Sequence, residues 1–143
     1  DEEIAADVYV KAIRKAREDE NIKAIVLRIN SPGGSFHASD RMWREISLTA
    51  KTKPIIASMG DYAASGGYYM AMGCNAIVAQ PGTITGSIGI FGIMLDMSGF
   101  FRDKLGVTFD EVKTGTYGNQ YTFTRPLSEA EKKIMQRSLD DYY

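Results

Sequence analysis

Ser65 is the residue of this chain whose surroundings best suit nucleophilic chemistry. It lies in the segment YAASGGY, residues 62–68, after an apolar run and before a predicted short helix. A helix N-terminus directs free N–H groups toward an oxygen placed there, and small neighbours leave space for a substrate. Ser65 is therefore a candidate nucleophile. Capping of the helix is the alternative, because serine caps helices routinely.

A second glycine-rich turn, NSPGGS at residues 30–35, follows another apolar run. Gly33 and Gly34 leave their backbone N–H groups unobstructed, and the N–H of Gly66 faces the same space if a helix begins at Ser65. Such donors can stabilise the oxyanion of an acyl-transfer reaction, each contributing roughly 10²–10³ in rate. An ordinary turn is the alternative for residues 32–34, and the pairing of the two turns argues against it.

The base that would activate Ser65 is harder to find in the sequence. His37, the only histidine, follows closely after Gly34, where a helix cap or a solvated side chain is the plainer interpretation. A lysine base would need burial, because its ordinary pKa near ~10.4 must fall to about 7–8. Lys113 is the least implausible internal lysine for this role. Seven others lie among charged residues and are expected on solvated faces: Lys11, Lys15, Lys23, Lys51, Lys53, Lys132 and Lys133.

The elements that must position these residues alternate between helix and strand. Amphipathic spacing predicts the helices, and apolar β-branched runs predict the strands, the first of which is expected to be buried on both faces. This order implies an α/β fold with a mainly parallel sheet built from βαβ units. Ligands bind such sheets at the carboxyl ends of the strands, where both glycine-rich turns lie. The predicted elements are helix 2–19, strand 24–30, helix 36–49, strand 54–59, helix 65–72 and strand 76–79.

The second half of the chain has a weaker pattern. A glycine at every third position in residues 83–92 suggests a strand or ribbon packed tightly against another backbone. Ser128 and Glu131 have the spacing of a capping box at the start of a last helix. The other predictions are a helix at 98–105, a strand at 108–113 and a polar loop at 114–121.

Composition limits the classes of function. The 143 residues fit one domain, 1–143, and a formal net charge of -1 gives no support for nucleic-acid binding. Cys74 is the only cysteine, so an intrachain disulfide is impossible, and a Cys/His zinc site is excluded because there is also only one histidine. No run approaches the ~20 apolar residues of a membrane span. The start at Asp1, without a methionine, leads us to expect a fragment of a longer protein.

Taken together, the motifs resemble the signal peptide peptidase A (protease IV) family of bacterial serine peptidases. The resemblance spans nearly the whole chain, and its motifs occur in order at family-like intervals. The matching segments are VLRINSPGGS at 26–35, SMGDYAASGGYY at 58–69, TGSIGIFG at 85–92 and the end from 127 to 141.

The resemblance implies a fold similar to the ClpP and crotonase superfamily and a Ser-Lys dyad that cleaves leftover signal peptides. By position, Ser65 matches the nucleophile, and Gly34 with the N–H of Gly66 matches the oxyanion hole. Ser87 matches a serine that hydrogen-bonds the catalytic lysine, with a packing or turn serine as the alternative. No cofactor and no metal are implied. The family also implies a homo-oligomer, expected to be a tetramer, at the bacterial inner membrane with its catalytic domain on the periplasmic side.

Gly118 departs from the family pattern. In the short members the catalytic lysine follows a Gly-x-x segment, and here Gly118 stands at that position, after Gly115-Thr116-Tyr117. In the long members two homologous repeats share the site: the amino-terminal repeat donates the lysine and the carboxyl-terminal repeat donates the serine. The chain therefore resembles the carboxyl-terminal repeat of a long member, and we expect it to be inactive or nearly so by itself.

Two other classes of function stay open at this stage. One is a crotonase-like enzyme that binds acyl-CoA, although Asp61 is the only carboxylate near the two turns. The other is a catalytically silent repeat that supports oligomerisation. As for substrate, Ile88, Ile90 and Phe91 would suit an extended hydrophobic peptide bound by strand addition, or they are plain core residues.

Overall fold

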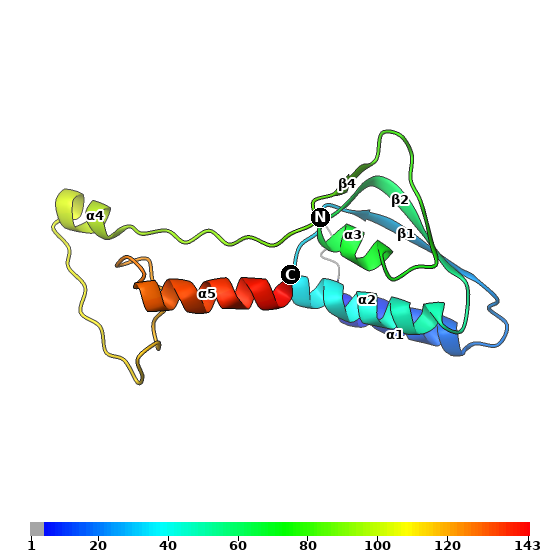
Figure 1. Ribbon diagram of the computed structural model, residues 1–143, viewed down its shortest axis with the longest axis horizontal. Helices are drawn as coiled ribbons and strands as arrows, with labels where there is room; N and C mark the ends of the chain where they lie inside the picture. Colours follow the sequence, from blue (N-terminus) through cyan, green and yellow to red (C-terminus); the bar gives the residue numbers. More distant parts are fainter. Residues whose placement is uncertain (1–4) are drawn as a thin grey trace. The chain divides into compact units, whose positions relative to one another are not determined.

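The computed structural model describes residues 5–143, which form two compact units. The first unit ends at Ile88, and the second comprises Gly89–Tyr143 (Figure 1). The sequence predicts one peptidase domain over residues 1–143. The division into two compact units does not test whether they form one domain, so this stays a prediction. Part of the first predicted helix, residues 2–4, lies outside the described residues.

The first unit is a parallel sheet covered by helices on one side (Figure 1). β2 lies between β1 and β3, and it pairs with β4 nearer its carboxyl end; all three pairings are parallel. This arrangement confirms the predicted α/β class with βαβ units. The elements are α1 (Ala6–Glu18), β1 (Ile25–Ser31), α2 (Phe36–Ala50), β2 (Ile55–Ala64), α3 (Gly66–Ala71), β3 (Ala76–Val78) and β4 (Ile84–Gly86).

Alternate residues of β1 and β2 build the core because successive strand side chains point to opposite faces. The inward set includes Ile29, Ile55 and Met59, which pack in one buried cluster with helix residues such as Ile46. The outward set is open: Val26 is 71% exposed. The prediction that strand 24–30 is buried on both faces is therefore wrong, since within the described chain the helices cover only one face.

An irregularity in β2 sets where its carboxyl end lies. Ile29 pairs with Met59, but Ser31, two residues later in β1, pairs with Ala63, so β2 contains two extra residues at this point. The side-chain oxygen of Asn30 accepts a hydrogen bond from the displaced Tyr62 N–H at 3.1 Å. The end of β2 is thereby brought level with the end of β1, where the NSPGGS turn begins.

A buried carboxylate joins the first two helices. Glu45 of α2 is only 3% exposed, and its oxygens lie 2.8 Å from Arg14 and 2.7 Å from Arg17, both on α1. The hydrogen bond from Arg14, with further charge from Arg17, holds the pKa of Glu45 below its ordinary value. Lys53, predicted on a solvated face, instead donates to the carbonyl of Ala16 at 2.9 Å, near the carboxyl end of α1. That prediction is wrong because the free carbonyls of a helix end attract a cation.

The second unit has little regular structure apart from its helices. α4 (Ser98–Phe100) continues directly into a π-helical turn, η1 (Phe101–Leu105), and α5 spans Glu129–Tyr142. The predicted helix at 98–105 is thus present. Residues 108–113, predicted as a strand, form none, and Val112 is 99% exposed. β-branched composition favours a strand only where a partner strand can pair with it, and none lies beside this segment in the described chain.

Candidate active site

Ser65 stands at a sharp turn between β2 and α3. Its backbone has φ 51° and ψ −117°, a conformation that residues other than glycine rarely adopt. Its N–H donates to the carbonyl of Gly86 at 2.8 Å, which ties the turn to β4. Its side chain makes no capping hydrogen bond to α3. The capping interpretation is therefore wrong, and the hydroxyl is left for another role.

The NSPGGS turn packs directly against this serine. Gly33 has φ 107°, and a Cβ added to it would lie 2.7 Å from the Cβ of Ser65 and 2.8 Å from the nitrogen of Gly66. Real Cβ atoms do not approach neighbours so closely, and L side chains rarely adopt this φ. Only glycine fits at position 33, so the two turns meet backbone to backbone.

The backbone donors around Ser65 differ in availability. The N–H of Gly33 is used, since it donates to the Ser31 hydroxyl at 3.2 Å. Among the described residues, no acceptor is found for the N–H of Gly34 or for that of Gly66. A Cβ added to Gly66 would lie 3.4 Å from the Gly34 nitrogen, which places the two groups close together. The structure thus leaves unused the two donors that the family resemblance matches to an oxyanion hole.

Ser87 occupies the corresponding position on the neighbouring strand. Ala64 of β2 pairs with Gly86 of β4, so the next residues, Ser65 and Ser87, follow side by side beyond the strand ends. Ser87 also has a left-handed backbone, with φ 52°, and it is exposed. Strained backbone conformations are rare and cluster at functional sites. Two strained serines at adjacent strand ends therefore mark this region as a candidate site.

The candidate bases within the chain are engaged elsewhere. Lys113 belongs to the second unit and forms an ion pair with Glu111 at 3.1 Å. His37 lies at the exposed start of α2, with its ring centroid 5.4 Å from that of Phe36. Cys74, the single cysteine of the chain, is a poor candidate nucleophile because burial raises the pKa of its thiol to about 11.

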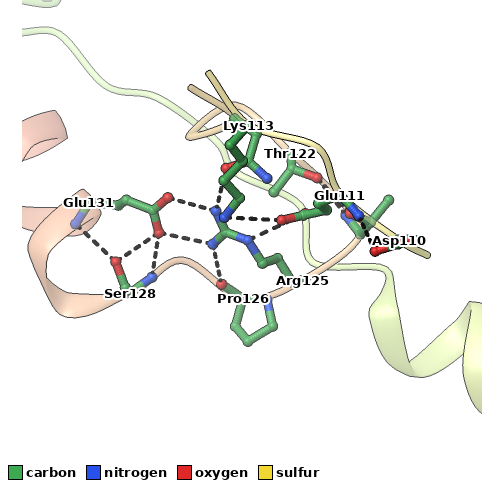
Figure 2. A network of polar contacts seen from close by, with 10 residues as sticks. Asp110, Glu111, Lys113, Thr122, Arg125, Pro126, Ser128 and Glu131 are labelled. Carbon is green, nitrogen blue, oxygen red and sulfur yellow. Dashed lines mark hydrogen bonds and ion pairs between the residues drawn. The ribbon is translucent and has the colours of Figure 1, made fainter. Parts of the chain in front are cut away.

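Sequence reasoning missed a cluster of charges that holds the polar loop of the second unit, shown in Figure 2. The Arg125 guanidinium donates to both carboxylate oxygens of Glu131, at 2.7 and 2.9 Å, and to the Asn119 side chain at 2.9 Å. It also lies 3.4 Å from Glu111 as an ion pair. Because Glu111 precedes the loop and Asn119 lies within it, one arginine joins the loop and the segment before it to the start of α5.

Glu131 is buried, at 3% exposed, and closes the predicted capping box with Ser128. The Arg125 hydrogen bonds, followed by those from Ser128, hold the pKa of Glu131 far below its ordinary value. The capping-box spacing signalled Glu131 in the sequence. Arg125 had no comparable local signal, because the side chains that it contacts, those of Glu111, Asn119 and Glu131, lie at least six residues away in the sequence.

Ile88 and Phe91 are 67% and 85% exposed, so the interpretation of these two residues as plain core is wrong.

Residues 5–143 contain no group of three or more His, Cys, Asp or Glu side chains able to hold a metal ion. Within the same residues, no helix combines the length and hydrophobicity that crossing a membrane requires.

A parallel α/β sheet in which a strained serine follows a strand end, makes no capping hydrogen bond and has free N–H groups beside it is an arrangement typical of serine hydrolases. The Peptidase family S49 model matches residues 47–143, and the Clp protease model matches residues 1–83. The chain belongs to peptidase family S49. The match to the Clp protease model and the parallel topology also confirm the predicted ClpP-like fold.

Curated relatives carry protease names. The chain is 45% identical to the chloroplastic serine protease SPPA of Arabidopsis thaliana, covering 98% of this chain and 21% of that protein. It is 42% identical to Protease 4 of Salmonella typhi, covering 98% of this chain and 22% of that protein. It is 35% identical to a putative signal peptide peptidase SppA of Enterococcus faecium, covering 94% and 39% respectively. The chain therefore spans well under half the length of each of these relatives.

One solved structure that is similar to this chain is that of a probable enoyl-CoA hydratase from Mycobacterium smegmatis. It has a TM-score of 0.48 and 21% sequence identity, and the match covers 94% of this chain and 65% of that one.

Proposed function

We propose that this chain supplies the nucleophile and the oxyanion hole of a serine endopeptidase that degrades cleaved signal peptides with a Ser-Lys dyad. The observation that carries the proposal is the Ser65 turn, in which a strained serine makes no cap bond and packs against the Gly33 backbone. Ser65 is the nucleophile, and the N–H groups of Gly34 and Gly66 bind the oxyanion.

The reaction follows the usual order for acyl transfer. The Ser65 hydroxyl attacks the carbonyl carbon of the scissile peptide bond while a neutral lysine takes its proton, and the carbonyl oxygen becomes an oxyanion. The tetrahedral intermediate collapses to an acyl-enzyme, and the lysine returns the proton to the leaving amine. Water, activated by the same lysine, then hydrolyses the ester. In this scheme Ser87, beside Ser65, hydrogen-bonds the lysine and orients it.

The lysine is proposed to come from a homologous amino-terminal repeat of the same protein. Position 118 carries a glycine, which cannot act as a base, and Lys113 is paired with Glu111. Relatives such as Protease 4 of Salmonella typhi, of which this chain covers 22%, are long enough to contain a second repeat. We further propose that the complete protein is a homo-oligomer, most simply a tetramer, at the inner membrane, with the site on the periplasmic side.

The proposed substrate is an extended hydrophobic peptide. The segment after β4 exposes Ile88 and Phe91 and forms no strand pairing among the described residues. Such a segment can pair with an extended peptide through its backbone while its side chains contact apolar residues of the substrate. Cleaved signal peptides have this composition, since they contain an apolar central region.

Replacement of the proposed nucleophile tests the function. In the complete protein, Ser65→Ala is expected to lower peptide cleavage by several orders of magnitude, because a missing nucleophile leaves only binding and oxyanion stabilisation. The matched control is Ser47→Ala, a serine of α2 that lies against Gly73 instead of the two turns. Cleavage of a fluorogenic apolar peptide would be measured for both. Unchanged cleavage by Ser65→Ala would favour a silent scaffold repeat instead.

A further inference from the structure

Ser39, near the start of α2, contacts both glycine-rich turns. Neither the sequence motifs nor the family resemblance assigns it a role. Its side chain is almost fully buried, with the residue 5% exposed. Its hydroxyl donates to the carbonyl of Ser35 at 3.0 Å, and its backbone N–H donates to the same carbonyl at 3.0 Å. Ser35 is the last residue of the NSPGGS turn, so Ser39 fixes the end of that turn.

The same hydroxyl oxygen also limits the position of Gly66. A Cβ added to Gly66 would lie 2.3 Å from the Ser39 Oγ, closer than to any other neighbouring atom. The next contacts are the Cα of Gly33 and the nitrogen of Gly34, both at 3.4 Å. The Ser39 oxygen, the Gly34 nitrogen and the Gly66 backbone therefore converge on one small region.

We propose that Ser39 is a positioning residue that sets the spacing between the N–H groups of Gly34 and Gly66. It holds the first turn through its bond to the Ser35 carbonyl, and it holds the second by filling the space against Gly66. The inference rests on the proposed function, since the spacing matters only if these two groups bind an oxyanion. Oxyanion stabilisation depends on donors held at about 2.7–3.1 Å from the developing charge, so a small shift has a large effect on rate.

Removal of the hydroxyl should loosen this arrangement without removing a catalytic group. Ser39→Ala leaves the Ser35 carbonyl with its backbone bond and opens a small void beside Gly66. The turns can then relax toward each other or apart. Because the oxyanion forms only after Ser65 attacks, the loss should appear in kcat, whereas the KM for an apolar peptide should change little.

The test compares Ser39→Ala, Ser39→Thr and Ser47→Ala in the complete protein. Ser47 lies on the same helix, and a Cβ added to Gly73 would lie 3.0 Å from its Oγ, so it makes a similar serine-to-glycine contact away from the two turns. We expect kcat of Ser39→Ala to fall at least about tenfold, on the scale of one weakened oxyanion donor. We expect KM to stay within about twofold, as for a transition-state effect, and Ser39→Thr, which keeps a hydroxyl, to retain more activity than Ser39→Ala. Ser47→Ala should behave as wild type.

Two results separate this inference from the proposed function. If Ser65-dependent cleavage is present in the wild type and Ser39→Ala cleaves with unchanged kcat, the role of Ser39 is wrong and the function stands. If the wild-type protein shows no Ser65-dependent cleavage, both are wrong. Should Ser39→Ala fail to fold, Ser39→Cys decides, because a thiol fills the space beside Gly66 but is only a weak hydrogen-bond donor. A lower kcat at unchanged KM for Ser39→Cys supports the positioning role, and a kcat equal to that of Ser47→Ala contradicts it.

Discussion

Ser65 and Ser87 both keep a backbone conformation that costs on the order of 1–3 kcal/mol for a residue other than glycine. Their φ values are 51° and 52°. The surrounding backbone compensates for the cost at Ser65, whose N–H bonds the Gly86 carbonyl and whose Cβ lies against Gly33. A capping serine would need neither the strain nor the close glycine.

At the residue scale, Gly33→Ala tests whether the two turns need this close approach. Its φ of 107° and the 2.7 Å approach to the Ser65 Cβ predict strain for any side chain. We expect the free energy of unfolding to fall by roughly 1–3 kcal/mol or more. Gly82→Ala is the control, since nothing lies within 4 Å of a Cβ added there and its φ is not in the left-handed region. Urea denaturation of both variants gives the comparison, and equal midpoints would contradict the packing described.

The sequence indicated where the candidate site lies better than it indicated the conformations and contacts of the residues in it. Residue types and neighbours sufficed to single out Ser65, Gly34 and Gly66, whereas Ser87 was singled out only by the family resemblance. Local sequence could not decide between a capping serine and a free one, because that depends on backbone angles set by the pairing of β2 with β4. Ser39 gave no signal for the same reason: its partners belong to two turns that only the folded chain brings together.

At the scale of elements, amphipathic spacing predicted α1 and α2, apolar β-branched runs predicted the parallel strands, and the capping box predicted α5. The two extra residues of β2 could not be predicted, since their position depends on the Asn30 side chain of the neighbouring strand. Residues 108–113, by contrast, were predicted as a strand but form none. Strand propensity was present there, but a pairing partner was not.

The contact between α1 and α2 should depend on pH through Glu45. Arg14 and Arg17 hold its pKa in the folded chain below its ordinary value of 4.5. The stabilisation is therefore present above pH 4.5 and is lost as the pH falls below that value toward the folded pKa. Glu45→Gln should be less stable than wild type at pH 7, and the difference should narrow as the pH is lowered to about 3.

Urea unfolding midpoints at several pH values check this expectation. Glu129→Gln is the matched control, because Glu129 pairs with Lys132 at the surface and its side chain is 83% exposed. The unfolding midpoint of Glu129→Gln should differ little from that of the wild type at every pH. If the difference in stability between Glu45→Gln and wild type stays constant across this pH range, the buried ion pair does not cause the loss of stability in the variant.

At the scale of the whole molecule, the proposed function assigns only part of an active site to this chain. Ser65, Gly34 and Gly66 lie in the first unit, and the loop that contains Gly118 lies in the second. Arg125 fixes that loop firmly, although it carries no lysine at position 118. The chain spans 21% of its Arabidopsis relative and 39% of its Enterococcus relative, which leaves room elsewhere for the base.

The proposed function makes Ser65 a nucleophile whose base lies outside this chain. Labelling by a serine-reactive phosphonate, followed by mass spectrometry of the modified peptide, tests it most directly. The complete protein should be labelled at Ser65, and the isolated chain should be labelled far more slowly, because without the lysine the hydroxyl keeps its proton. Rapid labelling of Ser65 in the isolated chain would contradict the divided dyad, and labelling of the complete protein at another serine would contradict the assignment of the nucleophile.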